Sequence, residues 1–324
     1  MNNSETIAVF ASIFLQAAPL MIAVIGETLT ERAGVINLSL DGTMLLSAMT
    51  GFIVAYETDN VWLGFLAAML VGAFFALIVA FGTIRLRQSQ VAIGFVLTLL
   101  GDDLSAFLGQ NYTRLPGPSL GRVSIPILAD IPVLGGLFFN QNLVFYIAVG
   151  LTIIGWWFLG RTQPGLKLRS VGERPEAAFA RGINVNRIRY AYTLIGGSLV
   201  GFAGASYSLA IKIGWSEGHT RGLGWIALAI VIFGGWAPIR GAIGAILFGA
   251  TKTLATVLQR RYPEVSVVAF NSIPWLLMIA VLLLVGSEWI EDMILMAPKK
   301  FQRPLRKLLR VSPPMALGEE FVKK

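Results

Sequence analysis

The sequence of 324 residues contains no cysteine and one histidine, His219. The chain therefore has no thiol for a disulfide, a metal site or a nucleophile, and a histidine-based metal centre is not expected. Charged residues make up only 14% of the chain, whereas a soluble domain carries about 25%. The phosphate-binding pattern GxxxxGK(S/T) and the zinc pattern HExxH are also missing. These absences argue against a soluble enzyme, and we expect this chain to bind no cofactor and no metal.

Apolar residues dominate the composition. Hydrophobic residues make up 55% of the chain, and the mean hydropathy is +0.70. We therefore predict an all-α polytopic membrane protein. The net charge of +8 comes from a few loops and the C-terminal tail, where membrane topology explains it better than a nucleic-acid partner does. The N-terminal residues MNNSET lack a basic region, so no cleaved signal peptide is expected.

A helix needs about 20 mostly apolar residues to cross a bilayer. About nine hydrophobic segments are candidates, at 7–29, 35–56, 61–84, 91–108, 142–160, 190–213, 223–236, 241–258 and 268–285. The segment 223–236 is too short for a full crossing, and we expect it to be broken or re-entrant. Residues 111–141 form a long loop with apolar patches, which suggests a stretch lying on or dipping into the interface. We assign 1–290 to a transmembrane domain and 291–324 to a basic cytoplasmic tail.

The interval 161–189 is the longest polar stretch between apolar segments. It holds seven Lys/Arg residues and two Glu residues. Short loops rich in Lys/Arg stay in the cytoplasm, so this loop fixes the orientation of the chain. In that orientation only Arg260 and Arg261 fall on the outer side against the rule. Within it, we expect a turn at Gly172 and Pro175 and then a short helix from Glu176 that ends before Gly182. Such a helix could dock on a partner protein, or the loop could simply be solvated.

Two similar joints suggest an internal repeat. Arg32 and a glycine precede an irregular apolar segment at 35–56, and Arg221 and a glycine precede another at 223–236. The first joint faces inside and the second outside, as expected of two inverted halves of about four segments each. Transporters with this design bind substrate near the midplane, beside broken helices. Glycine richness alone is the competing explanation.

Polar groups within the apolar segments are candidates for function, because they are costly in lipid. Asn37, Ser39 and Asp41 line a polar path or cap a helix start. Asp102 and Asp103 face an aqueous cavity, or their segment ends earlier than predicted. Two further groups have two interpretations each: Glu27 is a functional carboxylate or the partner of Arg32, and the outer loop with Trp215 and His219 is a binding surface or an interfacial anchor.

Three stretches resemble one family. Residues 30–44 (TERAGVINLSLDGTM) resemble the opening motif of bacterial ABC-importer permeases of the ribose/branched-chain amino acid type, and 171–183 (VGERPEAAFARGI) resemble that family's cytoplasmic coupling loop. Residues 220–238 (TRGLGWIALAIVIFGGWAP) are similar to its nucleoside/simple-sugar branch. The sequence departs from the family pattern at Asp41, where glutamate is expected, and at Asp102 and Asp103, where small or apolar residues are expected.

The resemblance implies a permease subunit in a bacterial inner membrane. It implies a second permease subunit, often a different chain, a cytoplasmic ATPase that holds ATP and Mg²⁺, and an extracytoplasmic substrate-binding lipoprotein. The implied ATPase-coupling residues are Gly172, Glu173, Pro175, Glu176, Ala177, Ala178 and Gly182. The candidates for the translocation pathway are Asn37, Ser39, Asp41, Asp102, Asp103 and Trp225.

Two alternatives stay open at this point. The first is an ABC permease for another small polar solute, such as a branched-chain amino acid. The second is a secondary transporter driven by an ion gradient, which the carboxylates Asp41, Asp102 and Asp103 would serve. An intramembrane enzyme has no support beyond these same carboxylates.

Overall fold

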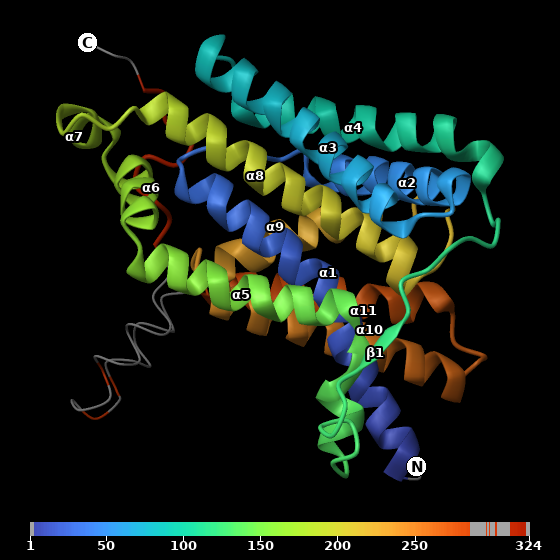
Figure 1. The fold of residues 1–324 in the computed structure, drawn as a ribbon. Helices are drawn as coiled ribbons and strands as arrows, with labels where there is room; N and C mark the ends of the chain where they lie inside the picture. The colour runs from blue at the N-terminus through green and yellow to red at the C-terminus, as the bar shows by residue number, and fades with distance from the viewer. Residues whose placement is uncertain (1–2, 286–295, 297, 299–301, 303–311, 322–324) are drawn as a thin grey trace.

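The computed structural model describes residues 3–285, 296, 298, 302 and 312–321. The chain is mostly helical (Figure 1), and six of the described helices are long and apolar enough to cross a membrane. This confirms an all-α polytopic membrane protein. The helices are α1 (Asn3–Arg32), α2 (Leu40–Thr58), α3 (Val61–Ala80), α4 (Gln90–Gly109), α5 (Leu143–Arg161), α6 (Gln163–Glu173), α7 (Pro175–Ala180), α8 (Val185–Ser206), α9 (Leu223–Phe233), α10 (Pro238–Arg261) and α11 (Val267–Val285).

Helices lie at all nine predicted hydrophobic segments, but α2, α9 and α11 are not among the six that meet the length and hydropathy needed for a crossing. The count of nine crossings therefore stays a prediction. Helix α9 has 11 residues, about 16 Å at 1.5 Å per residue, which is half the thickness of the hydrocarbon core. Most of the predicted tail, 291–324, lies outside the described residues.

Local sequence explains where several helices begin. The side chains of Asn60, Ser89, Asn142 and Asn184 each accept a hydrogen bond from a backbone N–H in the first turn of α3, α4, α5 and α8. The first N–H groups of a helix have no partner within it, and short polar side chains satisfy them. These caps set the helix boundaries within the long apolar sequence.

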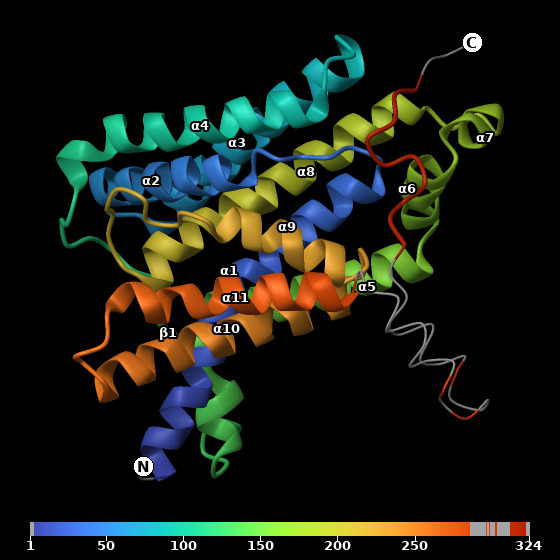
Figure 2. The ribbon, with the colours of Figure 1, turned by 180° about the vertical axis from the view of Figure 1, so that it is seen from behind.

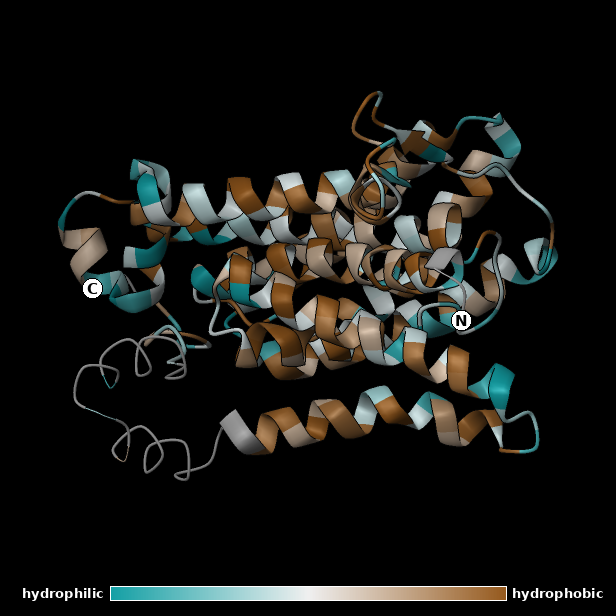
Figure 3. Cartoon of the chain, turned by 90° about the horizontal axis from the view of Figure 1, so that it is seen from below, coloured by the Kyte–Doolittle hydropathy of each residue, from teal (hydrophilic) through white to brown (hydrophobic). Residues whose placement is uncertain are grey.

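Helices α1 and α8 form the centre of the bundle. They pack against each other, with α3 and α2 on α8 and with α10 and α5 on α1 (Figures 1 and 2). Helix α4 lies outside α2, and α11 lies outside α10. Hydrophobic residues dominate the long helices, while polar residues gather toward the two ends of the bundle (Figure 3). This distribution is what a bundle immersed in lipid requires.

The long loop between α4 and α5 departs from an all-helical chain. It contains a short antiparallel pair, β1 (Arg122–Ser124) and β2 (Asn140–Asn142), in which Val123 is paired with Gln141. The π-helical turn η3 (Gly135–Phe139) lies between these strands and packs against α1. Similar π-helical turns, η1 (Phe81–Arg85) and η4 (Tyr207–Ile211), extend α3 and α8, and a 3₁₀ turn, η2 (Gln110–Tyr112), extends α4.

Candidate functional site

The basic interval 161–189 folds into two helices, α6 and α7, which we call the coupling helices. Thr162 begins α6, because its hydroxyl accepts a hydrogen bond from the Gly165 N–H at 3.1 Å. Arg174 has a φ of −147° and a ψ of 83°, outside the helical region that a residue before proline avoids, and it separates α6 from α7. Gly182 has a φ of +79° and follows the end of α7, as predicted.

The prediction of a turn at Gly172 was wrong, because Gly172 lies within the last turn of α6. A Cβ atom there would overlap the carbonyl oxygen of Arg32, so only glycine lets α6 approach the end of α1 this closely. Sequence reasoning missed α6 altogether, because its high content of charge resembles a solvated loop. The pair Thr162 and Pro164 is a helix-start signal that would have found it.

The predicted coupling residues divide into a buried and an exposed set. Gly172, Pro175 and Ala178 are buried, and they hold the coupling helices onto the bundle. Glu176, Ala177 and Gly182 are exposed, and Glu173 is partly exposed. Of these, Glu176 and Ala177 lie on the side of α7 that faces away from the bundle.

Arg32 joins the coupling helices to α9. Its Nη1 lies 3.5 Å from Glu173 Oε1 at the end of α6. Its Nε donates to the carbonyl oxygen of Trp236 at 3.1 Å, and its Nη2 donates to that of Gly235 at 3.4 Å. Both carbonyls lie in the turn after α9, where the indole N–H of Trp236 donates to Glu31. One guanidinium therefore contacts both a coupling helix and the end of the short helix α9.

The alternative in which Glu27 pairs with Arg32 was wrong. Glu27 is fully buried, and its Oε1 accepts a hydrogen bond from the Asn37 N–H at 3.3 Å. Sequence reasoning did not identify Arg32 as a link, because its partners lie at the end of α6 and in the turn after α9, far away along the chain.

Asn37, Ser39 and Asp41 are buried and bonded to protein groups. Asn37 Oδ1 accepts from the Ser39 N–H at 3.1 Å and from its hydroxyl at 2.6 Å. Ser39 precedes α2 but makes no side-chain cap bond to it. The helix that is capped is α9: Asp41 accepts from the Gly222 N–H at 3.1 Å and from the Gly224 N–H at 3.0 Å.

The starts of α2 and α9 meet at Asp41. A Cβ atom on Gly224 would overlap the backbone of Asp41, so the two helix starts are in direct backbone contact. The negative carboxylate at the positive end of α9 is also favourable to the helix dipole. We call Asn37, Ser39, Asp41, Gly222 and Gly224 the polar junction.

The structure brings Asp102 to the edge of this junction but not Asp103. Asp102 pairs with Arg221, just before α9, at 3.3 Å. Asp103 follows it on α4 and is exposed. Trp225 is partly buried in the first turn of α9. Among the described residues, no group of three or more imidazole or carboxylate side chains is placed to hold a metal ion.

His219 lies in the loop before α9 and is only 6% exposed. Its Nε2 donates to the carbonyl of Lys212 at 2.9 Å, and its Nδ1 accepts from the Ser216 hydroxyl at 3.2 Å. Trp215 packs beside it and is 2% exposed, so neither of them is an exposed surface anchor. Burial and the charge of Lys212 lower the pKa of His219 to about 4.

We expect the protein to lose thermal stability as the pH falls from about 6.5 toward 4. In the unfolded chain His219 takes up a proton below its ordinary pKa of about 6.5, whereas the folded chain resists this until about pH 4. The stabilisation, on the order of 3 kcal/mol, is thus complete above the unfolded pKa and is lost across this window. Melting curves in detergent measure it. His219→Asn should flatten the loss, and a parallel loss in both proteins would contradict the prediction.

Comparisons with known proteins agree on one family. A family model described as "Branched-chain amino acid transport system / permease component" matches residues 9–286. The putative glucose ABC transporter permease protein TsgC13 of Haloferax volcanii is 40% identical over 242 residues, which cover 74% of each chain. The nucleoside ABC transporter permease protein NupC of Lactococcus lactis is 36% identical over 269 residues, covering 79% of this chain and 85% of NupC.

The guanosine ABC transporter permease protein NupQ of Bacillus subtilis is 38% identical over 257 residues, which cover 74% of this chain and 79% of NupQ. No solved structure gives a significant match. All three relatives are similar to this chain over most of their length.

Proposed function

Because the chain belongs to the family of permease components of branched-chain amino acid transport systems, we propose that it forms the membrane pathway of an importer for nucleosides or related simple sugars. As a family member it is a permease subunit of an ABC importer and a multi-pass membrane protein. It is a transport subunit and not an enzyme, and ATP hydrolysis falls to a separate ATPase chain. The names of the three relatives mention glucose, nucleosides and guanosine. These names support a nucleoside or sugar substrate over a branched-chain amino acid.

The coupling helices carry the proposal. They lie at one end of the bundle, with one side of α7 open and the other packed against the protein. Arg32 contacts Glu173 behind that open side and also the turn after α9. A cytoplasmic ATPase that pushes on α7 would therefore act on α9 through a single side chain. An ion-driven transporter has no ATPase to act on the coupling helices, so this arrangement favours an ABC permease.

The packing supports two inverted halves. Helices α1 and α8 would be the first helices of the two halves, and they pack against each other. Each also packs against the third helix of the other half: α1 against α10, and α8 against α3. The second helices, α2 and α9, meet start to start at the polar junction. We propose that α1–α4 and α8–α11 are these halves, that nine segments enter the membrane, and that the pathway passes beside the junction, with Asn37, Ser39, Asp41, Asp102 and Trp225 near it. Asp103 is assigned to a partner-facing or hydrated surface of α4.

The proposed partners follow from the family. They are a cytoplasmic ATPase carrying ATP and Mg²⁺, a second permease subunit of a different sequence, and a substrate-binding lipoprotein on the outer side of a bacterial inner membrane. Capture of radiolabelled guanosine, glucose or leucine by that lipoprotein measures the substrate class directly. Capture of leucine alone would overturn the nucleoside/sugar proposal and leave the permease function intact.

Changing the open side of α7 should weaken ATPase binding. We expect Glu176→Arg to reduce ATPase copurification by about tenfold, because a charge reversal in an interface costs more than 1.4 kcal/mol, the equivalent of a tenfold change in affinity. Glu264→Arg is the matched control, because Glu264 is exposed near the start of α11, at the opposite end of the bundle. Equal effects of both changes, or substrate uptake by the purified chain without any ATPase, would contradict the proposal.

A further inference from the structure

Residues 312–321 return to the coupling end of the bundle, where they lie beside α6 (Figure 1). We call this segment the strap. It contains two Glu and no Lys or Arg, unlike the basic residues that flank it in the tail. Within it Pro314 and Ala316 are buried, although the segment has no regular secondary structure apart from turns. A burial of this kind far along the chain requires partners on the bundle.

The backbone of the strap bonds to two separate parts of the protein. The Ala316 N–H donates to the Gly172 carbonyl at 2.9 Å, and the Gly318 N–H donates to the Gly34 carbonyl at 3.1 Å. Gly172 lies in the last turn of α6, where carbonyls have no partner within the helix. Gly34 lies in the irregular joint between α1 and α2 and has a φ of +88°. The strap therefore supplies donors to carbonyls that their own elements leave without one.

Gly318 is fitted to the joint. Its φ is +79°, a conformation that favours glycine, and a Cβ atom there would lie 2.9 Å from Ile36 Cδ1. Any other residue at this position would have to change the backbone or push the strap away from the joint. A substitution at Gly318 thus displaces the strap without touching the coupling helices.

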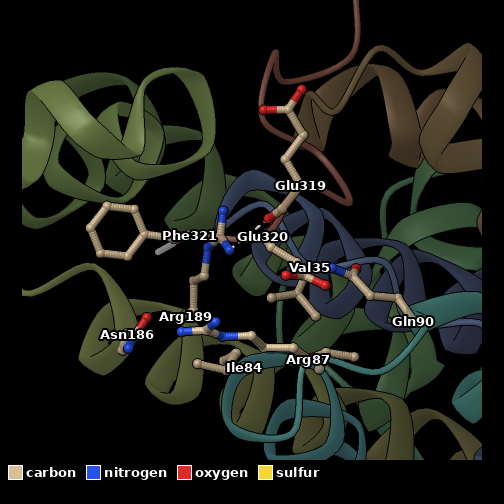
Figure 4. Close-up of a pocket in the computed structure, with 10 residues that line it drawn as sticks. Val35, Ile84, Arg87, Gln90, Asn186, Arg189, Glu319, Glu320 and Phe321 are labelled. Atoms are coloured by element: carbon tan, nitrogen blue, oxygen red, sulfur yellow. Dashed lines mark hydrogen bonds between the residues drawn. The ribbon is translucent and has the colours of Figure 1, made fainter. Parts of the chain in front are cut away.

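A buried arginine holds the end of the strap. Arg189 of α8 is 3% exposed, and its Nη1 donates to the Glu319 carbonyl at 2.8 Å. Figure 4 shows the Arg189 side chain extending from α8 to the strap backbone, with the Glu319 carboxylate pointing away from it. Beyond it, the Phe321 ring lies 5.6 Å from that of Phe179 on α7. The strap thus contacts the joint, both coupling helices and α8.

We propose that the strap clamps the coupling helices to the α1–α2 joint, so that movement imposed on α6 and α7 by an ATPase reaches the polar junction. The joint leads directly from Gly34 to Asn37, Ser39 and Asp41, and the strap bonds to Gly34 at its start and to Gly172 of α6. The inference rests on the proposed function, because only an ATPase on the coupling helices gives the clamp something to transmit. It adds a second link beside Arg32, contributed by the other end of the chain.

Docking of the strap is tested by single thiols, since the natural chain has no cysteine. Met315 is 68% exposed and Ala316 is 2% exposed. A maleimide should label Met315→Cys readily and Ala316→Cys about tenfold more slowly, because labelling a buried thiol requires local opening. Equal labelling rates would show that the strap is not docked and would overturn the proposal without reference to any ATPase.

Coupling is tested in the assembled transporter, purified with its ATPase and reconstituted in liposomes. Deleting 312–324 should lower the substrate taken up per ATP hydrolysed by about tenfold, the equivalent of 1.4 kcal/mol, while the ATPase still copurifies. A synthetic peptide of residues 312–324 should restore uptake, and a scrambled peptide of the same composition should not. Gly318→Val in the full chain should reproduce the loss, and Met315→Ala should not.

The possible failures are distinguishable. If the truncated transporter couples uptake to ATP hydrolysis as the wild type does, the clamp is overturned and the permease function still stands. If the truncated chain does not assemble, wild-type coupling in Gly318→Val has the same meaning. A full-length transporter that neither binds an ATPase nor shows substrate-stimulated ATP hydrolysis overturns the proposed function and the clamp together.

Discussion

Replacing Arg32 with alanine is expected to abolish most substrate uptake while the ATPase stays bound and continues to hydrolyse ATP. The change removes the two hydrogen bonds to the carbonyls of Gly235 and Trp236 and the contact with Glu173. A hydrogen bond from a charged donor contributes about 1.5–3 kcal/mol. The link between α6 and the end of α9 should therefore weaken by at least about tenfold. The open side of α7 is untouched, so ATPase docking is preserved.

Three variants separate the contacts of Arg32. Arg32→Lys should rescue poorly, because one ammonium group cannot reproduce the fork that reaches two carbonyls and a carboxylate. Glu173→Gln removes the ion pair, whose groups are 19% and 42% exposed, and leaves an amide oxygen that can still accept from the Met315 N–H, so its effect should stay below about 1 kcal/mol. Arg187→Ala is the matched control, since Arg187 is exposed at the same end of the bundle.

The measurement is the ratio of labelled substrate imported to ATP hydrolysed, in liposomes that contain the assembled transporter. A low ratio in Arg32→Ala with normal hydrolysis identifies a broken link. If Arg187→Ala lowers the ratio equally, or if Arg32→Ala leaves it unchanged, then Arg32 does not transmit the movement.

The positions and ends of individual helices could be predicted from the sequence. Hydropathy alone placed helices at each predicted segment, and the shortness of α9 was evident from its apolar run. Gly182 ended a coupling helix as expected, because a residue with positive φ after a helix favours glycine. These features depend only on residues within a few positions of one another.

Contacts between residues far apart along the chain could not be predicted from the sequence. Asp41 was recognised as a polar group that needs a partner, but its partner Gly224 lies 183 positions away. The same holds for Arg32 with Trp236 and for the strap with Gly172. In each case a side chain or backbone group meets the irregular end of another helix, and no periodic pattern marks such an end. In the proposed inverted arrangement, the pairing of the two halves decides which ends meet, and a single sequence shows this pairing only faintly.

Replacing Asp41 with alanine should be the most damaging change at the polar junction. Asp41 accepts hydrogen bonds from two N–H groups at the start of α9, and it is 5% exposed. Losing a capping side chain costs about 1–2 kcal/mol, and two buried N–H groups left without partners cost about 1–3 kcal/mol each. Helix α9 has only 11 residues, so an unsatisfied first turn is a large part of it. We expect a lower melting temperature and at least about a tenfold loss of uptake.

Asp41→Asn removes the charge that favours the helix dipole and one of the two acceptors, because Asp41 uses both carboxylate oxygens and an amide has only one oxygen. It should lose less than Asp41→Ala. Asp41→Glu introduces the residue that the family resemblance leads one to expect, but its longer side chain must fit where Gly224 already touches the Asp41 backbone.

Asp103→Ala is the matched control, since this exposed aspartate lies on α4 and not at the junction. Asp102→Ala should be mild, because Arg221, its partner, is 58% exposed. If Asp41→Ala and Asp103→Ala behave alike in both melting and uptake, the cap on α9 does not hold the junction together.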